Sequence, residues 1–115
     1  MRDMKRKISS YYGILRRLTQ SIVITNKTGR NLSLEPGFKK VIYLVTACAK
    51  RGRNLMFIGN GASASISSHM AVDFWKHAGI KAIAFNDPAQ LTCLSNDYGY
   101  EQVFAKPIEM FSARG

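Results

Sequence analysis

Two side chains with the chemistry of a metal or acid–base site stand close together in the middle of the sequence. His69 and Asp73 are four residues apart, and in a helix that spacing places them on one face. An imidazole and a carboxylate so placed can hold a divalent metal ion or share proton transfer. The competing interpretation is a histidine that is merely hydrogen-bonded to a neighbouring aspartate, and spacing alone favours it.

A glycine-containing turn lies just before this pair. An apolar run, Leu55 to Ile58, is typical of a strand buried on both faces, and Gly59 to Ser63 follows it. A strand, a glycine turn and a helix in this order bring backbone N–H groups to a ligand at the helix N-terminus. Asn60 and Gly61 are thus candidates for ligand binding, and Ser63 is expected to cap the helix or to bind a sugar hydroxyl or phosphate oxygen.

The turn differs from two common nucleotide-binding motifs. Ala64 stands where the dinucleotide-binding fingerprint has its third glycine, and the Gly-Lys-Ser/Thr ending of a Walker-type phosphate loop is missing. The sequence therefore predicts no nucleotide cofactor.

Two segments together resemble a known family. FIGNGASASISSHMAVDF (57–74) resembles the opening motif of the sugar isomerase (SIS) domain in the phosphoheptose isomerase branch, and LTCLSNDYGYEQVF (91–104) resembles a second motif of that family. The resemblance implies an α/β fold: a three-layer parallel sheet with flanking helices, of the SIS or flavodoxin-like kind. It covers only the N-terminal half of the family's domain, truncated after the second strand.

The resemblance also assigns roles to individual residues. It implies that Asn60, Gly61, Ser63 and Asp97 bind substrate, that His69 binds a metal, and that Asp73 acts as base and metal ligand. The family usually has glutamate where Asp73 stands and a second glycine where Ala62 stands. His77 occupies a position from which an arginine contacts the substrate in related enzymes.

The function that the resemblance implies is the aldose–ketose isomerisation of a phosphosugar such as sedoheptulose 7-phosphate, with a divalent metal such as zinc in the complete domain. Two alternatives stay open: a non-catalytic phosphosugar-binding or regulatory SIS protein, and an inert truncated fragment. The family's phosphate-gripping loop and later metal-site residues would follow Gly115, so we expect no activity without a C-terminal half. Family members are usually homotetramers, which implies self-association.

The rest of the chain is expected to support this site. We interpret 1–115 as part of one domain, with a helical lead-in over 1–53 and a βα core over 54–115. Apolar periodicity predicts helices over 8–23, after Ser33, and from Ser63 to His77, with a second strand over 81–85. Asp87 and Pro88 predict the start of another helix. Two helix faces are expected to be buried: one is formed by Phe38, Val41, Ile42, Val45 and Cys48, and the other by Ile66, Met70 and Phe74.

Charge and cysteine content narrow the class of protein. The net charge is +10, with +11 in residues 1–53 and −1 in residues 54–115. We interpret it as a solvated surface, because no aromatic residues are interleaved with the basic ones as in nucleic-acid-binding patches. No apolar run is long enough to cross a membrane, and no signal peptide core follows the basic N-terminus. The sequence therefore predicts a cytoplasmic protein with Cys48 and Cys93 buried and reduced.

Overall fold

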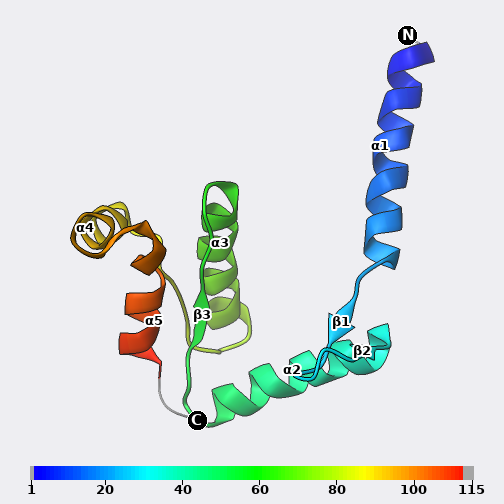
Figure 1. Ribbon diagram of the computed structural model, residues 1–115. Helices are drawn as coiled ribbons and strands as arrows, with labels where there is room; N and C mark the ends of the chain where they lie inside the picture. The colour runs from blue at the N-terminus through cyan, green and yellow to red at the C-terminus, as the bar shows by residue number, and fades with distance from the viewer. Residues whose placement is uncertain (1, 113–115) are drawn as a thin grey trace. The chain divides into compact units, whose positions relative to one another are not determined.

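The structure is a computed structural model that describes residues 2–112 (Figure 1). By its internal contacts the chain divides into two units, with the boundary between Tyr43 and Leu44. The boundary falls inside helix α2 (Leu34–Lys50), whereas the sequence placed the division after residue 53. The expectation of a single domain stays a prediction.

The first unit holds a helix, a small hairpin and the first part of α2. Helix α1 covers Arg2–Gln20, so it begins well before the predicted start at residue 8. Strands β1 (Ile24–Thr25) and β2 (Asn31–Leu32) pair antiparallel around a loop in which Asn26 Oδ1 accepts hydrogen bonds from the backbone N–H groups of Thr28 and Arg30. The sequence predicted the loop but missed the strands, because two-residue strands leave no periodic pattern.

The second unit contains the parallel βαβ element that the sequence predicted. Strand β3 (Leu55–Phe57) leads into helix α3 (Ala62–His77), which returns to strand β4 (Ala82–Ala84). The strands pair parallel in the register Leu55–Ala82, Met56–Ile83 and Phe57–Ala84. α3 packs on both strands, and Figure 1 shows α3 on one side of β3 and α5 on the other. An α/β fold with a small parallel sheet and several helices is thus confirmed.

The remaining elements follow β4. Helix α4 (Pro88–Tyr98) begins as predicted, with the Asp87 carboxylate accepting a hydrogen bond from the Gln90 N–H at 2.9 Å. The sequence predicted a break at residues 96–99, but α4 continues to Tyr98 and ends at Gly99, whose φ of 89° favours glycine. A short 3₁₀ helix (Tyr100–Gln102) and helix α5 (Ala105–Phe111) complete the described chain.

The core of the described residues is small and differs from the predicted one. Ala71, Phe85 and Val103 are its buried apolar side chains. α3 buries Ser67 and Ala71, whereas Ile66 is 62% exposed and Met70 is 36% exposed, so the prediction was wrong for two of the three residues of its core face. Other residues predicted to be buried are also exposed: Phe38, Val41, Ile42 and Cys48 in α2, and Cys93 in α4. Both cysteines are free thiols.

These exposed apolar side chains lead to a prediction about the isolated chain. Because few side chains are buried and a two-stranded sheet leaves backbone groups unpaired at its edges, residues 1–115 should melt with low cooperativity and should associate as concentration rises. Circular dichroism melting and sedimentation velocity at several concentrations measure both properties. A monodisperse monomer with a reversible, cooperative melt above about 65 °C would contradict this prediction.

Candidate functional site

Helix α3 carries three polar side chains in a row, each one turn from the next. Asp73 lies in the middle, with its Oδ2 3.5 Å from His69 Nε2 and its Oδ1 3.7 Å from His77 Nε2. The Asp73 side chain is 39% exposed, whereas the two imidazoles are 78% and 66% exposed. The predicted proximity of His69 and Asp73 is therefore present, and His77 joins them.

The packing of α3 explains why this row faces outward. Ser67 and Ala71 are buried, and the Phe74 ring lies 5.5 Å from the Phe57 ring of β3. Residues 69 and 73 lie two positions after 67 and 71, or roughly 200° around the helix, so they lie away from the buried face. The apolar contacts of α3 with the strands thus set the orientation of the polar row.

The turn between β3 and α3 is held by close backbone contacts. A Cβ built on Gly59 would lie 2.5 Å from the Ser63 carbonyl oxygen, so only glycine fits there. Gly61 has φ 56° and precedes the helix as its N-cap residue. The predicted cap was wrong: Ser63 lies inside the first turn, where its Oγ donates to the Asn60 carbonyl at 2.6 Å and fastens the turn to the helix.

The side chain of Asn60 is tied to a distant part of the chain. Tyr100, at the start of the 3₁₀ helix, donates its phenolic O–H to Asn60 Oδ1 at 2.6 Å. This bond leaves the Asn60 Nδ2 group as a donor for a ligand. The sequence patterns did not predict a role for Tyr100, although it lies in the second motif, because nothing in the spacing shows that the two motifs meet.

Asn86 was also missed, and it joins the loop after β4 to α3. Its Nδ2 donates to the Ala64 carbonyl at 2.7 Å and to Ser68 Oγ at 2.8 Å. An open hollow lies here, lined by Ala64, Ser65, Ser68, His69, Val72 and Asn86. Asn86 follows the second strand directly, and the carboxyl ends of parallel strands are where ligands bind in open α/β sheets, so its position was a usable signal.

Asp97 has only local contacts among the described residues. Its Oδ2 lies 3.6 Å from Cys93 Sγ, one turn back in α4, and its Oδ1 accepts a hydrogen bond from Asn96 Nδ2 at 3.0 Å. Asp97 neither contacts His69 or Asp73 nor lines the hollow. Its role toward a sugar therefore stays a prediction.

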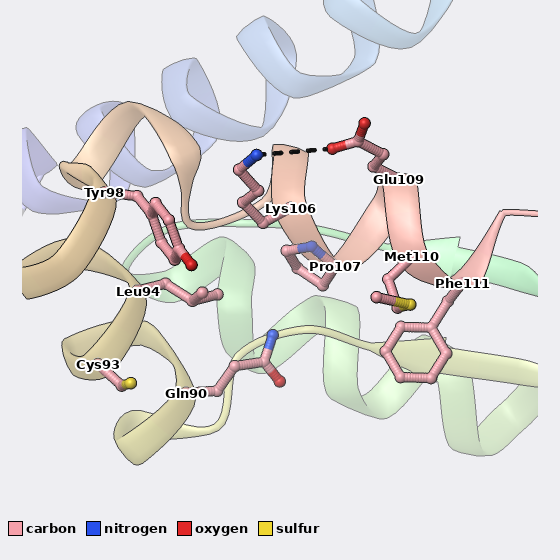
Figure 2. Close-up of a pocket in the computed structure, with 9 residues that line it drawn as sticks. All are labelled: Gln90, Cys93, Leu94, Tyr98, Lys106, Pro107, Glu109, Met110 and Phe111. Atoms are coloured by element: carbon pink, nitrogen blue, oxygen red, sulfur yellow. Dashed lines mark ion pairs between the residues drawn. The ribbon is translucent and has the colours of Figure 1, made fainter.

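A larger cavity, about 690 Å³, lies between α4 and α5 but offers less chemistry (Figure 2). Its lining is mainly apolar, and the Lys106–Glu109 ion pair at 3.7 Å lies on α5. Gln90 Nε2 is buried there with no hydrogen-bond partner among the described residues. No histidine and none of the sequence-predicted site residues line it, so the smaller hollow beside His69 is the better candidate.

The donor atoms of His69 and Asp73 fit part of a zinc site. Two ligands that each lie about 2.0–2.2 Å from one tetrahedral ion are roughly 3.3–3.6 Å apart, and the His69 Nε2 to Asp73 Oδ2 distance is 3.5 Å. Catalytic zinc sites use three protein ligands, and the described residues contain no such group of three. Any remaining ligands would have to come from outside residues 2–112.

Comparison with known proteins identifies the class. The structure resembles that of phosphoheptose isomerase from Neisseria gonorrhoeae, with a TM-score of 0.72 over 95% of this chain and 55% of that chain at 22% identity. The likeness shows that the chain has the fold of a phosphoheptose isomerase over the matched part, an α/β fold of the SIS type.

Sequence comparison then gives the family. The chain is 35% identical over 91 residues to phosphoheptose isomerase from Thermodesulfovibrio yellowstonii, which covers 74% of this chain and 44% of that protein. It is 42% identical over 72 residues to phosphoheptose isomerase from Roseiflexus sp., which covers 57% and 36%. No family model matches the chain. The chain is a homologue of phosphoheptose isomerases, as the resemblance implied, and spans less than half the length of these curated relatives.

The Gly59 contact gives a prediction about the turn. Gly59→Ala should destabilise the chain by about 1–3 kcal/mol, because the new methyl group would overlap the Ser63 carbonyl. Gly13→Ala is the matched control, since its Cβ would have no neighbour closer than 3.8 Å and helix propensity favours alanine by about 1 kcal/mol. Urea unfolding followed by circular dichroism measures both changes. Equal stability of Gly59→Ala and the parent would show that the turn is not held as described.

Proposed function

We propose that the chain is a phosphosugar-binding part of an aldose–ketose isomerase, with a heptose phosphate such as sedoheptulose 7-phosphate as substrate. The observation that carries the proposal is the position of His69, which lines a hollow at the carboxyl ends of two parallel strands and lies 3.5 Å from Asp73. The names of the relatives supply the substrate class.

The residues around the hollow suit sugar recognition. The Asn60 amide is a donor for hydroxyl or phosphate oxygens, and the Tyr100 bond fixes the Asn60 side chain. The Ser63 and Ala64 N–H groups already donate to the Asn60 and Gly61 carbonyls. Ser63 Oγ donates within the turn, so it offers a ligand only its acceptor capacity. Asp97 is included as a second sugar contact because it matches the family motif.

Asp73 is the proposed base. It takes the proton from the hydroxyl-bearing carbon next to the sugar carbonyl and returns it to the former carbonyl carbon, while the hydroxyl proton moves to the former carbonyl oxygen, so that the carbonyl moves by one carbon without net loss of atoms. A divalent metal such as zinc, held by His69 and Asp73 with ligands from elsewhere, would polarise the sugar oxygens when bound. Asp73 Oδ1 does not face His69, and we assign to it the acceptance of the proton.

The proposal extends to the setting of the protein. Because the chain matches only part of each relative, we propose that it has no isomerase activity alone and acts within a homo-oligomer or with a complementing polypeptide. A cytoplasmic location agrees with two free cysteines. Among the described residues no helix has the length and apolar character needed to cross a membrane.

Activity measurements separate the proposal from its alternatives. The chain alone should not turn over sedoheptulose 7-phosphate, whereas the chain co-expressed with the remaining part of the Thermodesulfovibrio yellowstonii relative should. In that complex His69→Ala and Asp73→Asn should abolish turnover, while Asp73→Glu should keep it. Each substitution should change the free energy of unfolding by less than about 1 kcal/mol, because the polar contacts are solvent-exposed.

Other outcomes of this experiment identify the competing functions. Tight phosphosugar binding by the complex, with turnover that is absent in the parent and in Asp73→Glu alike, would indicate a non-catalytic binding protein. A complex that neither forms nor binds phosphosugar would indicate an inert fragment. Turnover by the purified chain alone, free of host isomerases, would contradict the proposed dependence on a second half.

A further inference from the structure

We propose that His77 is a positioning residue that orients the Asp73 carboxylate toward His69. The proposal rests on the proposed function, because it concerns the same pair of residues, and it assigns a role to a side chain that no part of that function uses. The observation behind it is that the two oxygens of one carboxylate face two different imidazoles, Oδ2 toward His69 and Oδ1 toward His77.

An aspartate carboxylate needs such a second contact because the group can rotate about its bond to Cβ. Rotation about the bond to its carboxylate is broad and roughly two-fold, so a single partner does not fix the plane of the group. A second partner on the other oxygen fixes both ends of the carboxylate. His77 supplies it from one turn further along α3, in the mirror position to His69.

The surroundings distinguish the two histidines. His69 lines the hollow with Ser68 and Asn86, next to the glycine turn. His77 is the last residue of α3, and it does not line the hollow. His77 therefore acts through Asp73 rather than on a ligand in the hollow. The alternative, in which His77 is itself a metal ligand together with Asp73, uses the same four-residue spacing and is an outcome of the test.

The size of the effect is set by exposure. Partners that orient metal ligands typically change metal affinity by about 10–100-fold, and a contact of 3.7 Å with an imidazole that is 66% exposed should fall at or below the lower end. We expect His77→Ala to weaken Zn²⁺ binding by about 3–10-fold. His77→Gln keeps a side-chain donor of similar reach and should restore most of the loss.

Two measurements on the full 115-residue chain test the proposal. The first is independent of metal: the ring signals of His69, observed by long-range ¹H–¹⁵N NMR at fixed pH, should shift in His77→Ala and should stay in place in the control Lys76→Ala, which removes a neighbouring side chain outside the row. Unchanged His69 signals in His77→Ala would overturn the proposal whether or not the chain binds metal.

The second measurement is calorimetric titration with ZnCl₂. We expect the parent and His77→Gln to bind Zn²⁺ most tightly, His77→Ala to bind it less tightly, and His69→Ala to bind it least tightly. A loss in His77→Ala as large as in His69→Ala, with no recovery in His77→Gln, would make His77 a ligand and overturn the positioning role. Absence of Zn²⁺ binding in the parent would count against the metal part of the proposed function, while the NMR result still decides the role of His77.

Discussion

The parallel pairing of β3 with β4 is the constraint on which the candidate site depends. Its three registered residue pairs are extended at both ends by hydrogen bonds, from the Leu55 N–H to the Lys81 carbonyl at 2.8 Å and from the Phe85 N–H to the Phe57 carbonyl at 3.2 Å. Because the strands run in the same direction, the loops that follow them emerge at the same edge. Gly59–Gly61 and Asn86 meet the first turns of α3 for this reason.

Two side-chain bonds convert this shared edge into a defined surface. Asn86 fastens the loop after β4 to α3, and Tyr100 fastens the 3₁₀ helix to the turn after β3. Each bond joins segments that lie far apart in the sequence, so each restrains a polar group that a ligand would meet. The polar row on α3 is restrained differently: the burial of Ser67 and Ala71 and the contact of Phe74 with Phe57 of β3 fix how the helix is rotated, and the row lies outside these contacts.

Local sequence patterns predicted the elements of this site better than its contacts. Apolar runs predicted the β3–α3–β4 unit, capping chemistry predicted the Asp87 cap, and helical spacing predicted the proximity of His69 and Asp73. Each of these patterns acts over a few residues. Two hydrogen bonds, Tyr100 to Asn60 and Asn86 to Ser68, depend on how distant segments meet in space, and no local pattern shows this. The prediction of the core face of α3 was wrong because it followed hydrophobicity, and Ile66 and Met70 are more apolar than Ser67 and Ala71. In the structure the buried residues of α3 are the small ones, Ser67 and Ala71.

The central claim is that the glycine turn, Asn86 and His69 together bind a sugar phosphate. The most direct measurement is an NMR titration of the ¹⁵N-labelled chain with sedoheptulose 7-phosphate, in which chemical-shift changes are mapped on the assigned amides. The account predicts that the largest changes cluster at residues 59–65, His69 and Asn86. Changes confined to the apolar cavity between α4 and α5, or no saturable change at millimolar ligand, would contradict it.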